Sequence, residues 1–182
     1  MDLTGWTWLN EPRQWSADPL TVRADAGSDF WRLTGNGLVR ENGHLFGTAL
    51  TGDFTITATF SGEYAAQYDQ AGIGLVLDGE NWIKAGVEVY EGRRQASTVV
   101  TRGFSDWNLA LVGEFERFTV TARRQGDAVW VTYGLDGAEP VTLLRKAYFP
   151  PQVEAKAGIL TASPDGEGFT TQFHEVQVTQ LP

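Results

Sequence analysis

Cysteine is absent from this sequence of 182 residues, which excludes disulfides, thiolate metal sites and a cysteine nucleophile. There is also no apolar run of the length that a membrane-spanning helix needs. The N-terminal stretch MDLTGWTWLN has neither the basic region nor the apolar segment of a signal peptide. From this missing signal we expect a cytoplasmic protein.

Basic residues are scarce. The sequence has 14 Lys and Arg against 23 Asp and Glu, a formal net charge of -9. Long-range repulsion from such a chain disfavours a phosphate backbone or an anionic membrane surface. We therefore expect no nucleic-acid or membrane partner, and a neutral or cationic ligand fits the overall charge better.

Metal-ligating residues are equally sparse. The only histidines are His44 and His174, and neither has a second histidine at metal-ligand spacing. The turn SPDGEG, residues 163–168, has two carboxylates, whereas calcium prefers six to eight oxygen ligands. The sequence thus predicts no metal site and no cofactor.

Aromatic residues and glycine are abundant, with seven Trp, ten Phe, five Tyr and 21 Gly. The stretch DFTITATF alternates apolar residues with threonine, which is typical of a half-buried strand, and seven similar segments follow between turn-forming clusters. No segment keeps helical periodicity over three turns. We predict one all-β domain over residues 1–182, a two-sheet antiparallel β-sandwich of the jelly-roll type.

The hairpin AGIGLVLDGENWIKAGVEV can be aligned by its hydrophobic pattern. A three-residue loop at residues 79–81 pairs Ile73 with Val87 and gives both strands a continuous apolar face. The opposite face then carries Lys84, Gly86 and Glu88 beside further glycines. Interior glycines weaken a strand, so this bare patch predicts a shallow floor for a small ligand. The simpler interpretation is an ordinary solvent face, where Lys and Glu are common.

Several blocks resemble one known family. YDQAGIGLVLDGENWIKAGVEV, STVVTRGFSDWN, RKAYFP and TASPDGEGFTTQFHEVQV occur in this order and are similar to the domain-of-unknown-function family named for a regulator of enolase. The resemblance covers nearly the whole chain and implies a concanavalin A-like jelly-roll fold. Lectins and glucanases of that fold hold carbohydrate on the concave sheet, so the resemblance favours a carbohydrate or small polar ligand there.

The candidate ligand-binding residues combine the bare strand face with its predicted neighbours. Trp107, which we expect in a loop, offers an indole for stacking against a sugar, and neighbouring polar groups would bind hydroxyls. A loop anchored by a buried indole is an equally good interpretation of Trp107. The full set is Lys84, Glu88, Gly86, Asp69, Gln70, Trp107, Asp106 and His44.

Three functions remain open at this point. The first is carbohydrate binding or sugar sensing. The second is a glycoside hydrolase or lyase, with Glu88 and either Asp69 or Asp106 as the two carboxyl groups that such chemistry requires. The third, a protein-interaction domain that regulates a metabolic enzyme, follows only from the family's name. Glucanases of this fold carry Glu, Asp and Glu on one strand face, whereas this chain has Lys84, Gly86 and Glu88, a departure that weakens the second function.

Overall fold

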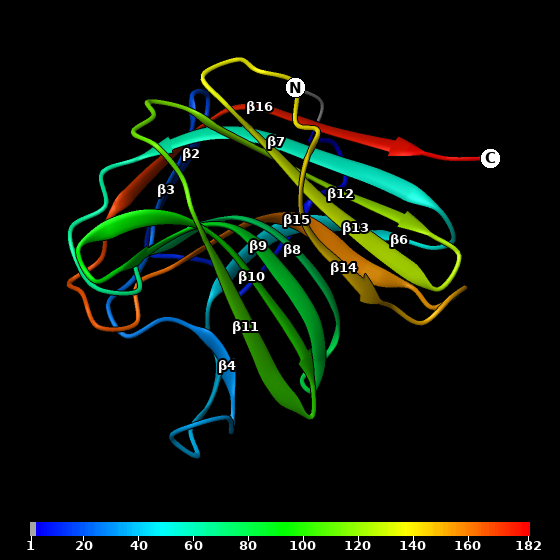
Figure 1. Ribbon diagram of the computed structural model, residues 1–182, viewed down its shortest axis with the longest axis horizontal. Helices are drawn as coiled ribbons and strands as arrows, with labels where there is room; N and C mark the ends of the chain where they lie inside the picture. Colours follow the sequence, from blue (N-terminus) through cyan, green and yellow to red (C-terminus); the bar gives the residue numbers. More distant parts are fainter. Residues whose placement is uncertain (1–2) are drawn as a thin grey trace.

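Two antiparallel sheets of seven strands each make up most of the computed structural model, which describes residues 3–182 (Figure 1). No helix in that range is long and apolar enough to cross a membrane. The sheets stack face to face, and one of them is strongly curved (Figure 1). The all-β sandwich predicted from the sequence is confirmed.

The spatial order of the strands differs from their order along the chain. Sheet one, the curved sheet, consists of β1 (Thr7–Leu9), β6 (His44–Leu50), β15 (Ala155–Ala162), β8 (Gln70–Asp78), β9 (Asn81–Tyr90), β10 (Arg93–Arg102) and β11 (Phe104–Leu111). Sheet two consists of β14 (Thr142–Tyr148), β13 (Ala128–Leu135), β12 (Phe118–Gln125), β7 (Phe54–Gly62), β16 (Thr170–Gln180), β3 (Leu20–Arg23) and β2 (Gln14–Ala17). A separate hairpin pairs β4 (Phe30–Arg32) with β5 (Val39–Glu41).

The core lies between the two sheets and is built by strands of period two. In β7, Phe54, Ile56, Ala58 and Phe60 are fully buried, while the intervening threonines are half-buried on the outer face. The other predicted strand segments lie, to within one residue, inside β8, β9, β10, β12, β13, β15 or β16. Alternation in the sequence therefore located most of the long strands.

The inward face of the β8–β9 hairpin is as predicted. Ile73, Leu75, Ile83 and Val87 are buried in the core between the sheets, and Val89 is half-buried at the end of β9. The polar residues of β9 project from the opposite face of sheet one, because successive side chains alternate.

The predicted register of this hairpin is wrong by two residues. Ile73 pairs with Ala85 rather than Val87, and the strands close between Asp78 and Asn81 after an irregularity that follows Val76. A shift of two leaves every side chain on the same face, so the hydrophobic pattern could not detect it. Leu77 has no cross-strand partner at this irregularity, and the two strands are joined by two loop residues, Gly79 and Glu80, instead of the predicted three.

The β4–β5 hairpin lies on the side of sheet one that faces away from sheet two (Figure 1). It is anchored by a second, small apolar cluster in which Phe30 packs with Leu45, Trp82 and Leu160. The rings of Phe30 and Trp82 are 5.8 Å apart between centroids. Part of the outer face of sheet one is thus covered, and the hairpin forms a wall over the polar residues of β9.

Candidate functional site

A cleft of about 300 Å³ lies between the β4–β5 hairpin and the outer face of sheet one. Three parts of the chain meet there: the hairpin region, strands β8, β9 and β11, and the loop before β16. Its lining residues are Asp29, Trp31, Asn36, Leu38, Arg40, Tyr68, Gln70, Lys84, Glu88, Trp107, Pro164 and Asp165.

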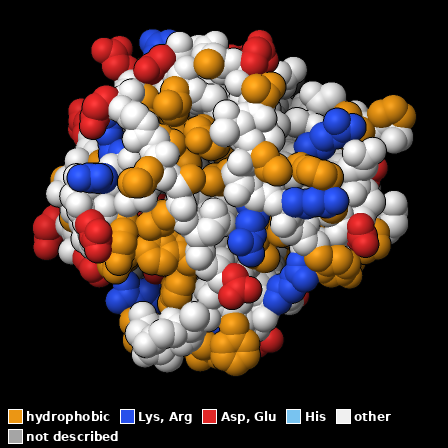
Figure 2. All heavy atoms as spheres, in the orientation of Figure 1, with side chains coloured by type: hydrophobic (Ala, Val, Ile, Leu, Met, Phe, Trp, Pro, Cys, Tyr) orange, Lys and Arg blue, Asp and Glu red, His pale blue; other side chains and the backbone are white. Residues whose placement is uncertain are grey.

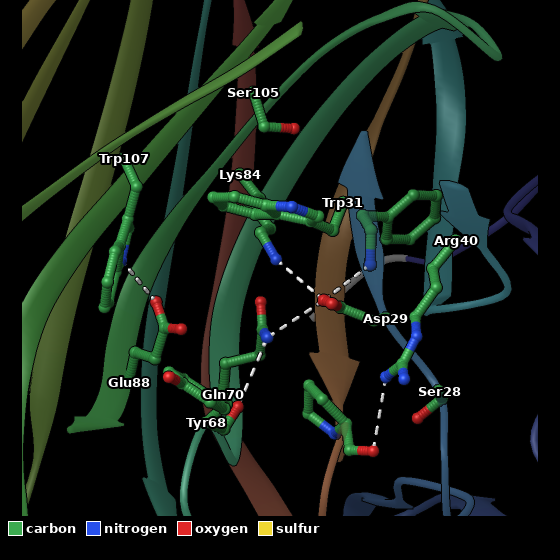
Figure 3. A network of polar contacts seen from close by, with 12 residues as sticks. Ser28, Asp29, Trp31, Arg40, Tyr68, Gln70, Lys84, Glu88, Ser105 and Trp107 are labelled. Atoms are coloured by element: carbon green, nitrogen blue, oxygen red, sulfur yellow. Dashed lines mark hydrogen bonds and ion pairs between the residues drawn. The ribbon is translucent and has the colours of Figure 1, made fainter. Parts of the chain in front are cut away.

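The floor of the cleft contains a buried ion pair. Lys84 Nζ lies 3.0 Å from Asp29 Oδ1, and their side chains are 5% and 12% exposed. The same oxygen accepts hydrogen bonds from Gln70 Nε2 at 3.2 Å and from the Phe30 backbone N–H at 2.7 Å (Figure 3). Three donors on one oxygen fix the carboxylate in place, because a buried charge needs partners that replace its hydration.

Glu88 is the second buried carboxyl group of the cleft. Its Oε2 accepts a hydrogen bond from the Trp107 indole N–H at 2.9 Å (Figure 3) and a second one from Ser97 Oγ at 2.6 Å. Burial raises the pKa of Glu88 above its ordinary value, although the charge of Lys84 and the two hydrogen bonds oppose this shift. A neutral Glu88 can donate a proton or a hydrogen bond from its other oxygen.

Aromatic rings form the walls. Trp107 packs edge-on against Tyr90, with ring centroids 5.0 Å apart, and also contacts Tyr68 at 6.1 Å. Trp31 reaches the cleft from the hairpin (Figure 3), and its indole N–H donates to the Thr34 carbonyl at 3.0 Å. Both indole N–H groups are used within the protein, so these rings offer mainly their apolar surfaces to a ligand.

The structure brings four of the predicted residues together, namely Gln70, Lys84, Glu88 and Trp107. Trp107 belongs to strand β11 and not to the loop that we predicted, although its ring does reach the cleft. Asp106, its neighbour on that strand, is exposed and does not line the cleft. Alternation directs Asp106 to the opposite face, so it supplies no carboxylate here.

Asp69 also falls outside the cleft, contrary to the prediction. It is fully buried, where Oδ2 accepts from the backbone N–H groups of Ala65 and Ala66 and Oδ1 accepts from Ser163 Oγ at 2.5 Å. With both oxygens bound, Asp69 joins the segment before β8 to the end of β15. Its role is structural.

His44 is buried and holds two backbone groups. Its Nε2 accepts from the Asp25 backbone N–H at 3.0 Å, so Nδ1 carries the proton and donates to the Asn10 carbonyl at 2.8 Å. No ring nitrogen is left for a ligand, and His44 is absent from the cleft lining. The structure thus places His44 away from the other predicted site residues, where it joins two backbone segments.

Strand packing accounts for the glycines of β8 and β9, from which we predicted a shallow floor for a ligand. Gly72 and Gly86 are direct cross-strand partners, and a Cβ on either would overlap a backbone carbonyl oxygen of the facing strand. A Cβ on Gly74 would meet Leu45 and Leu160 of the small apolar cluster. Close packing explains these glycines, and the cleft lies beside them, under the hairpin.

The sequence analysis missed the hairpin contribution, above all Asp29, Trp31 and Arg40. They lie in or beside two three-residue strands, too short to show a period-two pattern. The available signal was the composition of DFWR followed by TGNG, which places a carboxylate, an indole and a turn within nine residues.

The sequence matches a protein family, a named yeast protein and a yeast crystal structure over nearly the whole chain. The sequence profile of a family described as "Protein of unknown function (DUF1349)" matches residues 8–181. "Regulation of enolase protein 1" from Saccharomyces cerevisiae is 33% identical over 181 residues, covering 98% of this chain and 91% of the relative. A crystal structure of a functionally unknown protein from the same yeast superposes with a TM-score of 0.92 at 31% identity, covering 100% of both chains.

More distant structures share the jelly-roll fold alone. The carbohydrate-binding module CBM66 from Bacillus subtilis matches 97% of this chain and 96% of its own, with a TM-score of 0.63 and 15% identity. The GH43 protein BlXynB from Bacillus licheniformis matches with a TM-score of 0.72 and 14% identity, and the matched part spans 36% of that larger chain. The predicted jelly-roll architecture is thereby confirmed.

Proposed function

We propose that this chain, which belongs to the DUF1349 family of proteins of unknown function, binds a carbohydrate or a similarly small polar ligand. The ligand would lie in the cleft under the β4–β5 hairpin. The main support is that the Lys84–Asp29 ion pair and the buried carboxyl group of Glu88 line one cleft. The indole rings of Trp31 and Trp107 line the same cleft. Sugars present hydroxyls and apolar CH faces, which suit polar floors and aromatic walls.

The size of the cleft supports a small ligand. Ligand pockets range over roughly 300–1,000 Å³, and this cleft of about 300 Å³ lies at the lower limit. Asp29 Oδ2 and the free oxygen of Glu88 are available to hydroxyl groups. Lys84 uses one of its three N–H donors on Asp29 and keeps the others for the ligand. The similarity to a carbohydrate-binding module adds support at the level of the fold.

A glycan array followed by calorimetric titration of each hit tests this proposal. We expect Trp31→Ala to weaken binding of the best glycan at least tenfold, because one apolar wall of the cleft is removed. Trp130→Ala is the matched control, since Trp130 lies on β13 of sheet two, 37% exposed and outside the cleft. Equal losses in both variants, or an array without hits, would contradict the proposal.

The second candidate function is carbohydrate hydrolysis or elimination. Asp29 and Glu88 are two carboxyl groups in one cleft, and Glu88 is the one that burial favours in its neutral, proton-donating form. Products of an incubation with each array hit would reveal turnover. Loss of products with retained binding in Glu88→Gln would identify Glu88 as the acid, whereas unchanged glycans in every incubation would leave binding alone.

A protein partner is the alternative that the yeast relative's name suggests. The described surface offers exposed apolar side chains on one edge strand of each large sheet, including Phe104 and Leu111 on β11 and Leu143 on β14. Edge strands with exposed apolar residues can pair with another chain. Binding to a metabolic enzyme that survives Trp31→Ala but not substitutions on these strands would favour this alternative.

A further inference from the structure

Arg40 is a cation of the cleft that has no carboxylate partner. It lies opposite Trp31 in the hairpin register, and both residues line the cleft. Within residues 3–182 its guanidinium makes one hydrogen bond, from NH1 to the Pro164 carbonyl at 3.3 Å, and no ion pair (Figure 3). A guanidinium has five N–H donors, so most of its binding capacity is unused.

The other charges of the cleft are accounted for. Lys84 is paired with Asp29 in the floor, and Glu88 is bound by Ser97 and the Trp107 indole N–H. Asp165 also lines the cleft, but it is exposed to water and forms no ion pair with Arg40 among the described residues. An exposed carboxylate acts through a high dielectric and is screened by salt. Among the described residues, Arg40 is therefore the basic side chain of the cleft lining that has no carboxylate in contact with it.

We propose that the ligand carries a carboxylate, as a uronic-acid sugar does, and that Arg40 binds this group through its guanidinium fork. This inference rests on the proposed function and names its ligand class. The planar fork matches a carboxylate in two parallel hydrogen bonds, whereas a neutral sugar would leave most of these donors unused. Trp31, across the hairpin from Arg40, would contact the sugar ring that bears the carboxylate.

The negative net charge of the molecule does not oppose a single carboxylate strongly. Distant surface charges are screened over a Debye length of about 8 Å at physiological ionic strength, while a guanidinium in direct contact is screened much less. A phosphate dianion is a poorer fit, because it brings a second charge close to Asp29 and Asp165. The structure therefore favours a sugar acid over a sugar phosphate.

Matched sugar pairs test the inference on the full chain. Calorimetric titrations would compare D-glucuronate with D-glucose, and D-galacturonate with D-galactose. The two members of each pair differ only at C6. Oligosaccharide hits from the array would be titrated beside them. We expect the acid of at least one pair to bind at least tenfold more tightly than its neutral partner. Arg40→Gln should remove this preference for the acid, because the charge-assisted bidentate contact with the carboxylate is lost.

Arg123→Gln, on β12 of sheet two and outside the cleft, is the matched control and should keep the preference. Equal or tighter binding of the neutral sugars, or a preference that survives Arg40→Gln, would overturn the carboxylate assignment while leaving sugar binding intact. Tighter binding of glucose 6-phosphate than of glucuronate would also overturn it. Absence of binding by every acidic and neutral glycan would overturn the proposed function together with this inference.

Discussion

Lys84 and Glu88 project from the same face of β9, yet their environments stabilise different charge states. Lys84 faces Asp29 at 3.0 Å, and this contact offsets the cost of burying both charges. Glu88 has no cation at that distance among the described residues and is bound by a hydroxyl and an indole N–H. The two carboxyl groups of the cleft, Asp29 and Glu88, thus have different partners: a cation for Asp29, and a hydroxyl and an indole N–H for Glu88. This difference suits a site that both accepts and donates protons or hydrogen bonds.

The raised pKa of Glu88 makes a prediction about stability. Its pKa rises from an ordinary value of 4.5, so the folded state holds the proton more tightly than the unfolded state does. The stabilisation is complete below the unfolded pKa and is lost as pH rises through the folded one. Relative to Glu88→Gln, the free energy of unfolding of the wild type should fall from pH 4.5 upward, by about 1.4 kcal/mol per pH unit at most.

Urea unfolding of both proteins at a series of pH values from mildly acidic to neutral would measure this difference. Glu88→Gln is a suitable reference because its amide oxygen can accept the hydrogen bonds from Ser97 and Trp107. Two unfolding free energies that change in parallel with pH would show that Glu88 titrates normally in the folded protein.

At the scale of the elements, paired glycines let neighbouring strands of sheet one approach closely. Gly72 faces Gly86 across β8 and β9, and Gly47 faces Gly158 across β6 and β15. At each of these positions a Cβ would overlap a carbonyl oxygen of the facing strand. Backbone atoms of a central strand cannot move aside without breaking ladder hydrogen bonds, so these sites require glycine.

Gly86→Ala should therefore destabilise the protein strongly, and Gly86→Leu should not fold. The sequence pattern alone suggests the opposite, because leucine has a higher β-propensity than glycine. We expect Gly86→Ala to lower the free energy of unfolding by about 3 kcal/mol or more, or the melting temperature by about 10 °C. Circular dichroism on heating would measure the change.

Gly113→Ala provides the control for this substitution. No atom lies within 4 Å of the position that its Cβ would take, and Gly113 is outside the strands. Its melting temperature should stay close to that of the wild type. A Gly86→Ala protein as stable as Gly113→Ala would mean that β8 and β9 separate enough to admit a side chain.

For the whole molecule, the cleft depends on a long-range arrangement. The β4–β5 hairpin comes from residues 30–41, packs over strands from residues 70–111, and meets the loop at residues 163–169. In the view of Figure 2, basic side chains lie scattered among apolar ones, and most of the visible acidic groups lie toward the margin of the face. Local patches of either sign thus exist within a net charge of -9.

This net charge predicts weak interaction with polyanions. Fluorescence anisotropy of a labelled DNA duplex at 50 mM salt should show no saturable binding at protein concentrations up to about 100 μM, a range in which nonspecific DNA-binding proteins saturate. Repulsion at long range should dominate over the local basic patches. A salt-sensitive, saturable signal would instead show that a basic face acts independently of the total charge.

The sequence by itself determined the fold class, the position of most of the long strands and which residues of β8 and β9 face the core. Alternation of apolar residues contains that information, because side-chain direction has a period of two. It also singled out Lys84, Glu88, Gln70 and Trp107, which the structure places along one cleft. The resemblance to a known family added the jelly-roll architecture.

Only the tertiary structure decided what those residues do. It set the hairpin register two residues away from the prediction, assigned Asp69 and His44 to buried backbone contacts, and brought Asp29 to Lys84. A period-two pattern distinguishes the two faces of a strand but is unchanged by a shift of two, and it does not specify which loop covers a face. Asp29 and Lys84 are 55 positions apart, so their contact depends on how the hairpin packs against sheet one.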